Sequence, residues 1–155
     1  MTDAHTRILV LGSLPGEISL ARGQYYANPQ NQFWRLMAEV TGRPLPAMAY
    51  EQRLEALLEA GIGLWDVIAK AERAGSLDGA IRAHQPNALA AVAAGLPRLE
   101  AIAFNGGKAA AIGRKALAGC KVWTLVDLPS SSPAYTRPFA EKLEAWKALA
   151  AFLQA

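Results

Sequence analysis

The sequence predicts an α/β fold: a three-layer α/β/α sandwich with a central, mainly parallel four-stranded sheet. Three observations lead to this prediction. Short apolar runs alternate with segments of helical periodicity along the chain, which is the order of strand–helix–strand units. The apolar runs are nearly continuous, as expected for strands that are buried on both faces. The 155 residues, 52% of them hydrophobic, suffice for one packed core, and no linker divides residues 1–155.

The first half of the chain contains the first strand and two helices. Residues 7–12 (RILVLG) form an apolar run that ends in glycine, which predicts a buried strand. A loop punctuated by glycine and proline follows over residues 13–30, and loops of this length are usually functional. A helix begins at Asn31, with apolar residues at helical spacing as far as Val40, and another spans residues 50–60.

The second half repeats the alternation of strands and helices. Residues 61–68 predict a second strand, and residues 86–94 predict a helix after it. The third strand is predicted at residues 99–104, followed by a helix over residues 108–118. A fourth strand, a loop rich in proline and serine, and a final helix complete the chain at residues 121–126, 128–137 and 138–153.

The predicted carboxyl ends of the strands carry the polar segments of the sequence. In open parallel sheets, ligands bind beyond these ends. The segments there are rich in glycine, serine, amide or carboxylate: GSLPG at 12–16, WD at 65–66, NGG at 105–107 and LPSSS at 128–132. Small polar side chains and exposed backbone amides suit a phosphate or the edge of a heterocycle. GSLPG is no triphosphate-binding loop, because no Lys-Ser/Thr pair follows it.

Composition limits the other classes of function. The net charge of +3 and the pI of about 9.2 are compatible with a polyanionic partner without requiring one. Cys120 is the only cysteine and the histidines are His5 and His84, so we expect no disulfide, metal site or cofactor. No apolar run approaches the roughly 20 residues that span a bilayer, and the polar start lacks a signal peptide. We therefore expect a monomeric cytoplasmic protein with no membrane partner.

The polar segments also carry a family resemblance. GSLPG followed by YANPQNQFW at 26–34 resembles the opening motif of mismatch-type uracil/thymine-DNA glycosylases, which read GINPG and then Phe-Ala-His-Pro-x-Asn-x-Phe-Trp. GIGLWDV at 61–67 resembles their GIGLTN strand, and FNG at 104–106 resembles their FNGK element, although Gly107 precedes Lys108. LPSSS is similar to their DNA-binding loop. Four segments that match in order are a specific signal.

Two departures indicate a particular branch of this superfamily. The mismatch enzymes carry a water-positioning asparagine in GINPG where this chain has Leu14, and Asp66 stands where GIGLTN has its asparagine. The combination of GSLPG, QYYANPQNQFW, GLWDV and LPSSSPAY resembles the hypoxanthine-DNA (deoxyinosine) glycosylases instead. In that branch the catalytic asparagine belongs to the Pro-x-Asn-x-Phe-Trp segment, where this chain has Asn31.

The resemblance implies a DNA repair enzyme that removes a flipped deaminated base from double-stranded DNA and leaves an abasic site. Asn31 would hold the attacking water, Tyr26 would stack on the base, and the Asp66 carboxylate would accept from N1–H of hypoxanthine. The predicted base-binding residues are Ser13, Leu14, Tyr26, Asp66 and Asn105. The predicted DNA-binding residues are Lys108, Ser130, Ser131, Ser132 and Tyr135, with Tyr135 as the candidate wedge.

Plainer interpretations stay open for the same residues. Asn31 would serve equally as a helix cap, Asp66 as a cap or ion-pair partner, and Tyr135 as part of the core. The three serines would suit turns, and Lys108 would suit a solvated surface. The competing functions are a mismatch-type uracil/thymine-DNA glycosylase and a catalytically silent nucleic-acid-binding protein of the same fold.

Overall fold

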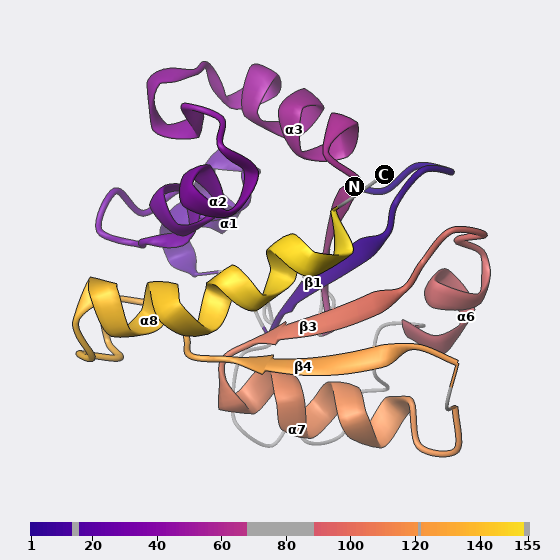
Figure 1. Ribbon diagram of the computed structural model, residues 1–155. Coiled ribbons are helices and arrows are strands. Elements are labelled where there is room, and N and C mark those ends of the chain that lie inside the picture. The colour runs from indigo at the N-terminus through magenta and orange to yellow at the C-terminus, as the bar shows by residue number, and fades with distance from the viewer. Residues whose placement is uncertain (14–15, 68–88, 121, 154–155) are drawn as a thin grey trace.

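The protein is organised around a parallel sheet in a computed structural model that describes residues 1–13, 16–67, 89–120 and 122–153. Four strands form the sheet in the order β2-β1-β3-β4, and each neighbouring pair is parallel (Figure 1). The strands are β1 (Ile8–Gly12), β2 (Ile62–Asp66), β3 (Ala101–Asn105) and β4 (Thr124–Leu128). The predicted four-stranded parallel sheet is confirmed.

Helices cover both faces of the sheet, which confirms the three-layer α/β/α arrangement. One layer contains α2 (Phe33–Thr41), the 3-10 turn η1 (Leu45–Ala47), α3 (Tyr50–Glu59), α8 (Phe139–Trp146) and the 3-10 segment η2 (Lys147–Phe152). The opposite layer contains α6 (Leu89–Ala94) and α7 (Gly107–Ala116). Over the part of the chain that the structure describes, no helix is long and apolar enough to cross a membrane.

Strand β1 shows why the apolar runs are continuous. Ile8 and Val10 face the core beneath α2, α3 and α8, whereas Leu9 and Leu11 face the core beneath α6 and α7. All four side chains are fully buried. Because successive strand residues point to opposite faces, a strand between two helical layers needs apolar residues at every position.

The structure differs from the sequence prediction in several elements. The loop predicted at residues 13–30 contains a short helix, α1 (Glu17–Arg22), which begins after Gly16 and ends at Gly23 in the left-handed conformation. The single final helix predicted at residues 138–153 is instead α8 followed by η2. The fourth strand begins at Thr124 rather than at residue 121, which lies outside the described residues, as do Leu14, Ile68 and the start of the helix predicted at 86–94.

Candidate active site

The carboxyl ends of the strands place the polar segments side by side. Gly12 at the end of β1 is the register partner of Asp66 at the end of β2. Asn105 at the end of β3 is the partner of Leu128, the last residue of β4. The chain leaves β1 toward β2 on one side and later returns to β3 on the other, and such a switch point opens a crevice above the sheet.

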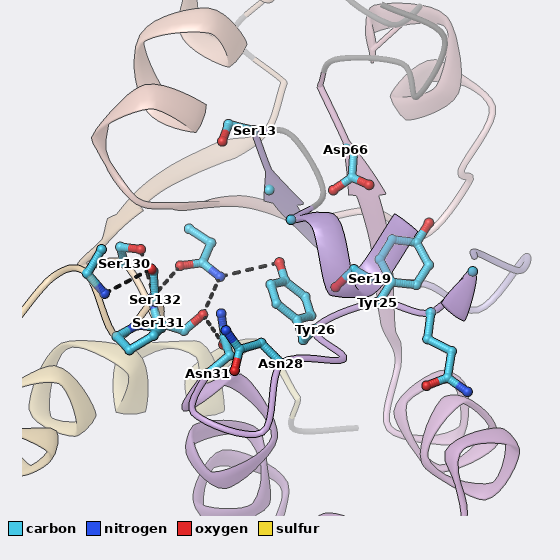
Figure 2. Close-up of a pocket in the computed structure, with 17 residues that line it drawn as sticks. Ser13, Ser19, Tyr25, Tyr26, Asn28, Asn31, Asp66, Ser130, Ser131 and Ser132 are labelled. Carbon is cyan, nitrogen blue, oxygen red and sulfur yellow. Dashed lines mark hydrogen bonds between the residues drawn. The ribbon is translucent and has the colours of Figure 1, made fainter. Parts of the chain in front are cut away.

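A cavity of about 540 Å³ occupies this crevice. It brings together eight of the residues that the sequence analysis selected, seven of which Figure 2 labels: Ser13, Tyr26, Asn31, Asp66, Asn105, Ser130, Ser131 and Ser132. Gln24, Tyr25, Asn28 and Ser19 also line it, and the sequence analysis did not select them. Lys108 and Tyr135 are exposed and do not line the cavity.

Asn31 lies two residues before the start of α2, and its side-chain oxygen accepts two hydrogen bonds. The backbone N–H of Phe33 donates to Asn31 Oδ1 at 2.9 Å, and the hydroxyl of Ser131 donates to the same oxygen at 2.7 Å. Asn31 therefore satisfies the N–H of the first residue of α2, although the N-cap position itself belongs to Gln32. Because both lone pairs of Oδ1 are occupied, the group that Asn31 offers to a ligand is its Nδ2 amide, a donor.

Ser131 is almost fully buried, with 1% of its surface exposed. Its hydroxyl donates to Asn31, and its backbone atoms are equally engaged: N–H donates to Asn105 Oδ1 at 2.9 Å and C=O accepts from Gln32 N–H at 2.9 Å. Ser131 thus joins the loop after β4 to β3 and to the start of α2. Its neighbours Ser130 and Ser132 are less buried and line the cavity beside it.

Asn105 links the loop of Ser131 to Tyr26. Its Nδ2 group donates to Ser131 Oγ at 2.9 Å and to the hydroxyl of Tyr26 at 3.3 Å. Both amide hydrogens are therefore used within the protein, and Oδ1 already accepts from Ser131. This arrangement fixes the positions of Ser131 and Tyr26 around the cavity.

Tyr26 is held in an unusual backbone conformation, with φ of 53°. A non-glycine residue in this region costs about 1–3 kcal/mol, and such residues gather at functional sites. One face of its ring stacks on Phe33, with centroids 3.9 Å apart and planes at 14°. Burial, and secondly the charge of Asp66, raise the pKa of Tyr26, so its hydroxyl stays protonated.

Asp66 and Tyr26 approach the end of β1 so closely that any side chain at Gly12 would have to displace them. A Cβ atom placed on Gly12 would lie 2.9 Å from Asp66 Oδ1 and 3.2 Å from the Tyr26 hydroxyl oxygen. Asp66 is half-buried, and its carboxylate also contributes to raising the pKa of Tyr25 to about 12, after the larger effect of burial. The site therefore holds a carboxylate beside a protonated phenol at the switch point of the sheet.

Two side chains of α8 hold the loop after β4 in place through hydrogen bonds to its carbonyls. Trp146 Nε1 donates to the carbonyl of Pro129 at 2.9 Å, and Lys142 Nζ donates to the carbonyl of Ser132 at 3.2 Å. Lys142 is 1% exposed, and burial lowers its pKa. The sequence analysis missed both supports, although a lysine within the apolar stripe of the final helix was a signal for Lys142.

Tyr135 and Lys108 lie outside the cavity, on the surface around it. The Tyr135 ring is 40% exposed, with the Arg137 guanidinium 5.4 Å from its centroid and Lys142 Nζ at 5.5 Å. Lys108 is exposed in the first turn of α7, two residues after Gly106. Their predicted contacts with DNA stay predictions.

Together, the fold and site define a parallel α/β domain with a polar cavity at its switch point. The cavity offers an amide donor, a carboxylate, a phenol and a half-buried aromatic ring. These groups can hold a planar heterocycle by its edge and face while they position a water molecule.

Comparison with known proteins gives the family. Residues 1–151 match the profile described as the uracil DNA glycosylase superfamily, and the chain belongs to that superfamily. It is 42% identical over 147 residues to a hypoxanthine DNA glycosylase of Methanosarcina acetivorans, covering 95% of this chain and 92% of the relative. A hypoxanthine DNA glycosylase of Methanosarcina barkeri is 42% identical over 106 residues, or 68% of this chain and 67% of the relative.

The fold is also that of a solved relative. The solution NMR structure of a Methanosarcina acetivorans protein described as a candidate uracil DNA glycosylase superposes with a TM-score of 0.84 at 38% identity. The match covers 99% of this chain and 94% of that chain.

Proposed function

We propose that this protein is a monofunctional DNA glycosylase that removes hypoxanthine, the product of adenine deamination, from DNA. The observation that carries the proposal is the convergence of Asn31, Tyr26 and Asp66 on one cavity at the switch point of the sheet. Its volume of about 540 Å³ lies within the range of small-ligand sites, roughly 300–1,000 Å³. The two Methanosarcina relatives named as hypoxanthine DNA glycosylases support the choice of base.

The base is recognised by its face and by one edge. After the damaged nucleotide leaves the duplex, the base stacks on the face of Tyr26 that Phe33 does not cover. The Asp66 carboxylate accepts a hydrogen bond from N1–H of hypoxanthine. Adenine has an unprotonated N1, so its lone pair would face the carboxylate and the adenine edge would be repelled where the hypoxanthine edge donates.

Asn31 acts on the attacking water as a hydrogen-bond donor. Since Phe33 and Ser131 occupy its side-chain oxygen, Nδ2 donates to the water oxygen and directs a remaining lone pair toward C1′ of the sugar. Little basicity is needed, because departure of the base leaves an oxocarbenium-like sugar that water attacks readily. We assign Ser131 a positioning role through Asn31, and phosphate contacts to Ser130 and Ser132, whose side chains are less buried.

The reaction balances as a hydrolysis. The C1′–N9 bond breaks, its electron pair remains with the base, and the water oxygen then bonds to C1′. One water proton is transferred to the base and the other stays on the new C1′ hydroxyl. The products are free hypoxanthine and an abasic site in an unbroken strand.

The test is a base-excision assay on matched duplexes that contain inosine, xanthine, uracil or a thymine mismatch, followed by alkaline cleavage of abasic sites. We expect inosine to be the preferred substrate and the strand to stay intact before alkali. Preferential cutting of uracil or thymine would identify the mismatch-type activity instead. Absence of cutting on all four duplexes, with DNA binding retained, would identify a silent binding protein.

Asp66→Asn tests the assigned choice of base. Asparagine keeps the size but presents both a donor and an acceptor to the base edge. We expect much of the inosine excision to be lost and at most weak uracil excision to appear, measured under single turnover. Unchanged rates on both bases would leave Asp66 as a structural residue.

A further inference from the structure

We infer that a second hollow, on the far side of the loop of residues 24–31, binds a phosphate of the DNA strand that delivers the damaged base. This inference rests on the proposed function and adds a binding site to it. The hollow has a volume of about 420 Å³ and lies between the ends of α1 and η1 and the starts of α2 and α3. No residue of it was selected from the sequence for phosphate binding.

The charged side chains that line this hollow are all positive. Three arginines, Arg22, Arg35 and Arg53, line it, and the lining contains no aspartate or glutamate among the described residues. Ion pairs within the described part of the chain involve none of the three. Like charges gathered in one hollow raise the local potential and attract an anion, most strongly one that several guanidinium groups can share.

One cation of the hollow is also held in place by the protein before any anion binds. Arg53 is fixed at its wall, where Nε donates to the carbonyl of Met48 and Nη2 to the carbonyl of Pro46, each at 3.0 Å. Its guanidinium lies 5.3 Å from the centroid of the Trp34 ring. A cation that is already held in place loses less freedom when an anion binds than a mobile side chain does.

The position of the hollow relative to the base cavity indicates which anion it receives. Five residues of one continuous loop line both: Gln24, Tyr25, Tyr26, Asn28 and Asn31. The loop is therefore a partition with the proposed base site on one side and the arginines on the other. A strand whose damaged base enters the cavity passes over this partition, and its phosphodiester backbone supplies the anion.

The experiment uses Arg22→Gln and Arg35→Gln, two exposed positions where glutamine removes the charge and keeps a polar chain. Binding is measured on a duplex with 2′-fluoro-deoxyinosine, which resists hydrolysis, across a series of salt concentrations. We expect each variant to bind several-fold more weakly at low salt. The slope of log affinity against log salt should fall by about 0.9 for each phosphate that the protein no longer neutralises. Base release at saturating enzyme should fall less than the affinity does, because neither arginine lines the base cavity.

Arg98→Gln is the matched control, since Arg98 is exposed before β3, at the opposite end of the strands, and should leave the salt slope unchanged. Unaltered slopes in both arginine variants of the hollow would overturn the inference, as would saturable binding of inorganic phosphate at these arginines with no effect on DNA. A reduced slope in a protein that excises no base would instead keep the phosphate site and contradict the proposed function.

Discussion

Replacing Asn31 and Ser131, singly and together, tests the hydrogen bond that orients the proposed catalytic amide. Asn31→Ala removes the amide that the start of α2 presents to the cavity. Loss of one positioned catalytic group typically costs a hundredfold or more, so we expect single-turnover release of hypoxanthine to slow by on the order of 100-fold. The backbone N–H of Phe33 loses its partner as well, which should lower the free energy of unfolding by about 1 kcal/mol.

Ser131→Ala removes one of the two donors that hold the amide oxygen, at 2.7 Å, and leaves the other from Phe33. A hydrogen bond of this kind contributes about 0.5–1.5 kcal/mol. If that energy holds the amide in its reactive orientation, its loss corresponds to roughly a two- to thirteenfold slower base release. DNA affinity should change little, because the serine is buried.

The double variant decides between positioning and independent roles. Once Asn31 is alanine, Ser131 has no amide to orient, so Ser131→Ala should cause no further loss of rate. The assay is single-turnover excision on an inosine duplex by wild type, both single variants and the double variant. Additive losses would refute the positioning role of Ser131.

Asn31→Asp tests the polarity of the amide with almost no change of shape. One carboxylate oxygen would keep the donors from Phe33 and Ser131, and the other would replace the Nδ2 donor by an acceptor. We expect inosine excision to fall about as far as in Asn31→Ala. Activity within about tenfold of wild type, where alanine loses on the order of a hundredfold, would show that Asn31 works through its oxygen, contrary to the geometry.

Three further predictions follow from two glycines that have side chains close to them and from the burial of Tyr25. Gly12→Ala places a methyl group 2.9 Å from the Asp66 carboxylate, so base release should slow at least tenfold, an order-of-magnitude expectation for a displaced binding group. Gly113→Ala places a Cβ against Cε1 of the buried Phe104 ring, so urea unfolding should show a loss of about 1–3 kcal/mol. Tyr25 has its pKa raised to about 12 by burial, so the folded state keeps a proton that the unfolded state loses, and stability should fall as pH rises from about 10 toward 12.

One control serves both glycine variants, and another serves Tyr25. Gly95→Ala brings a Cβ no closer than 3.5 Å to the carbonyl oxygen of Val92, so excision and stability should both stay near wild type. Normal excision by Gly12→Ala would mean that the cavity adapts without cost. In Tyr25→Phe the alkaline loss of stability should shrink, and an unchanged pH profile would assign that loss to other groups.

The layers of the fold were predictable because their signals are local. Each strand is an apolar run and each longer helix has an apolar stripe. Their alternation along the chain was therefore sufficient to predict the parallel sheet and the helical layers on both of its faces. Helix α1 was missed because its six residues span fewer than two turns, too short for periodicity to register between Gly16 and Gly23. The break between α8 and η2 involves no glycine or proline, so the pattern continues through it.

The candidate site was predictable as a set of residues but not as a network. Motif spacing selected Asn31, Asn105 and Ser131, and all three line the cavity. Their hydrogen bonds depend on tertiary contacts that no local pattern encodes. Sequence reasoning therefore assigned Ser131 to DNA and Asn105 to the base, whereas their side chains are engaged with each other and with Tyr26 and Asn31.

The bond between Ser131 and Asn31 joins residues 100 positions apart, and this separation has a consequence for biosynthesis. During translation, the chain emerges with Asn31 and Tyr26 long before the serine that orients the amide. A nascent protein that has completed only β3 has the sheet edge, but Asn31 lacks the second of its two donors. On the role proposed for Asn31, we expect excision to begin only after the C-terminal segment folds back. If Asn31 acts as proposed, activity reports the last stage of folding, and we expect local opening of the loop after β4 to silence the enzyme while the sheet stays intact.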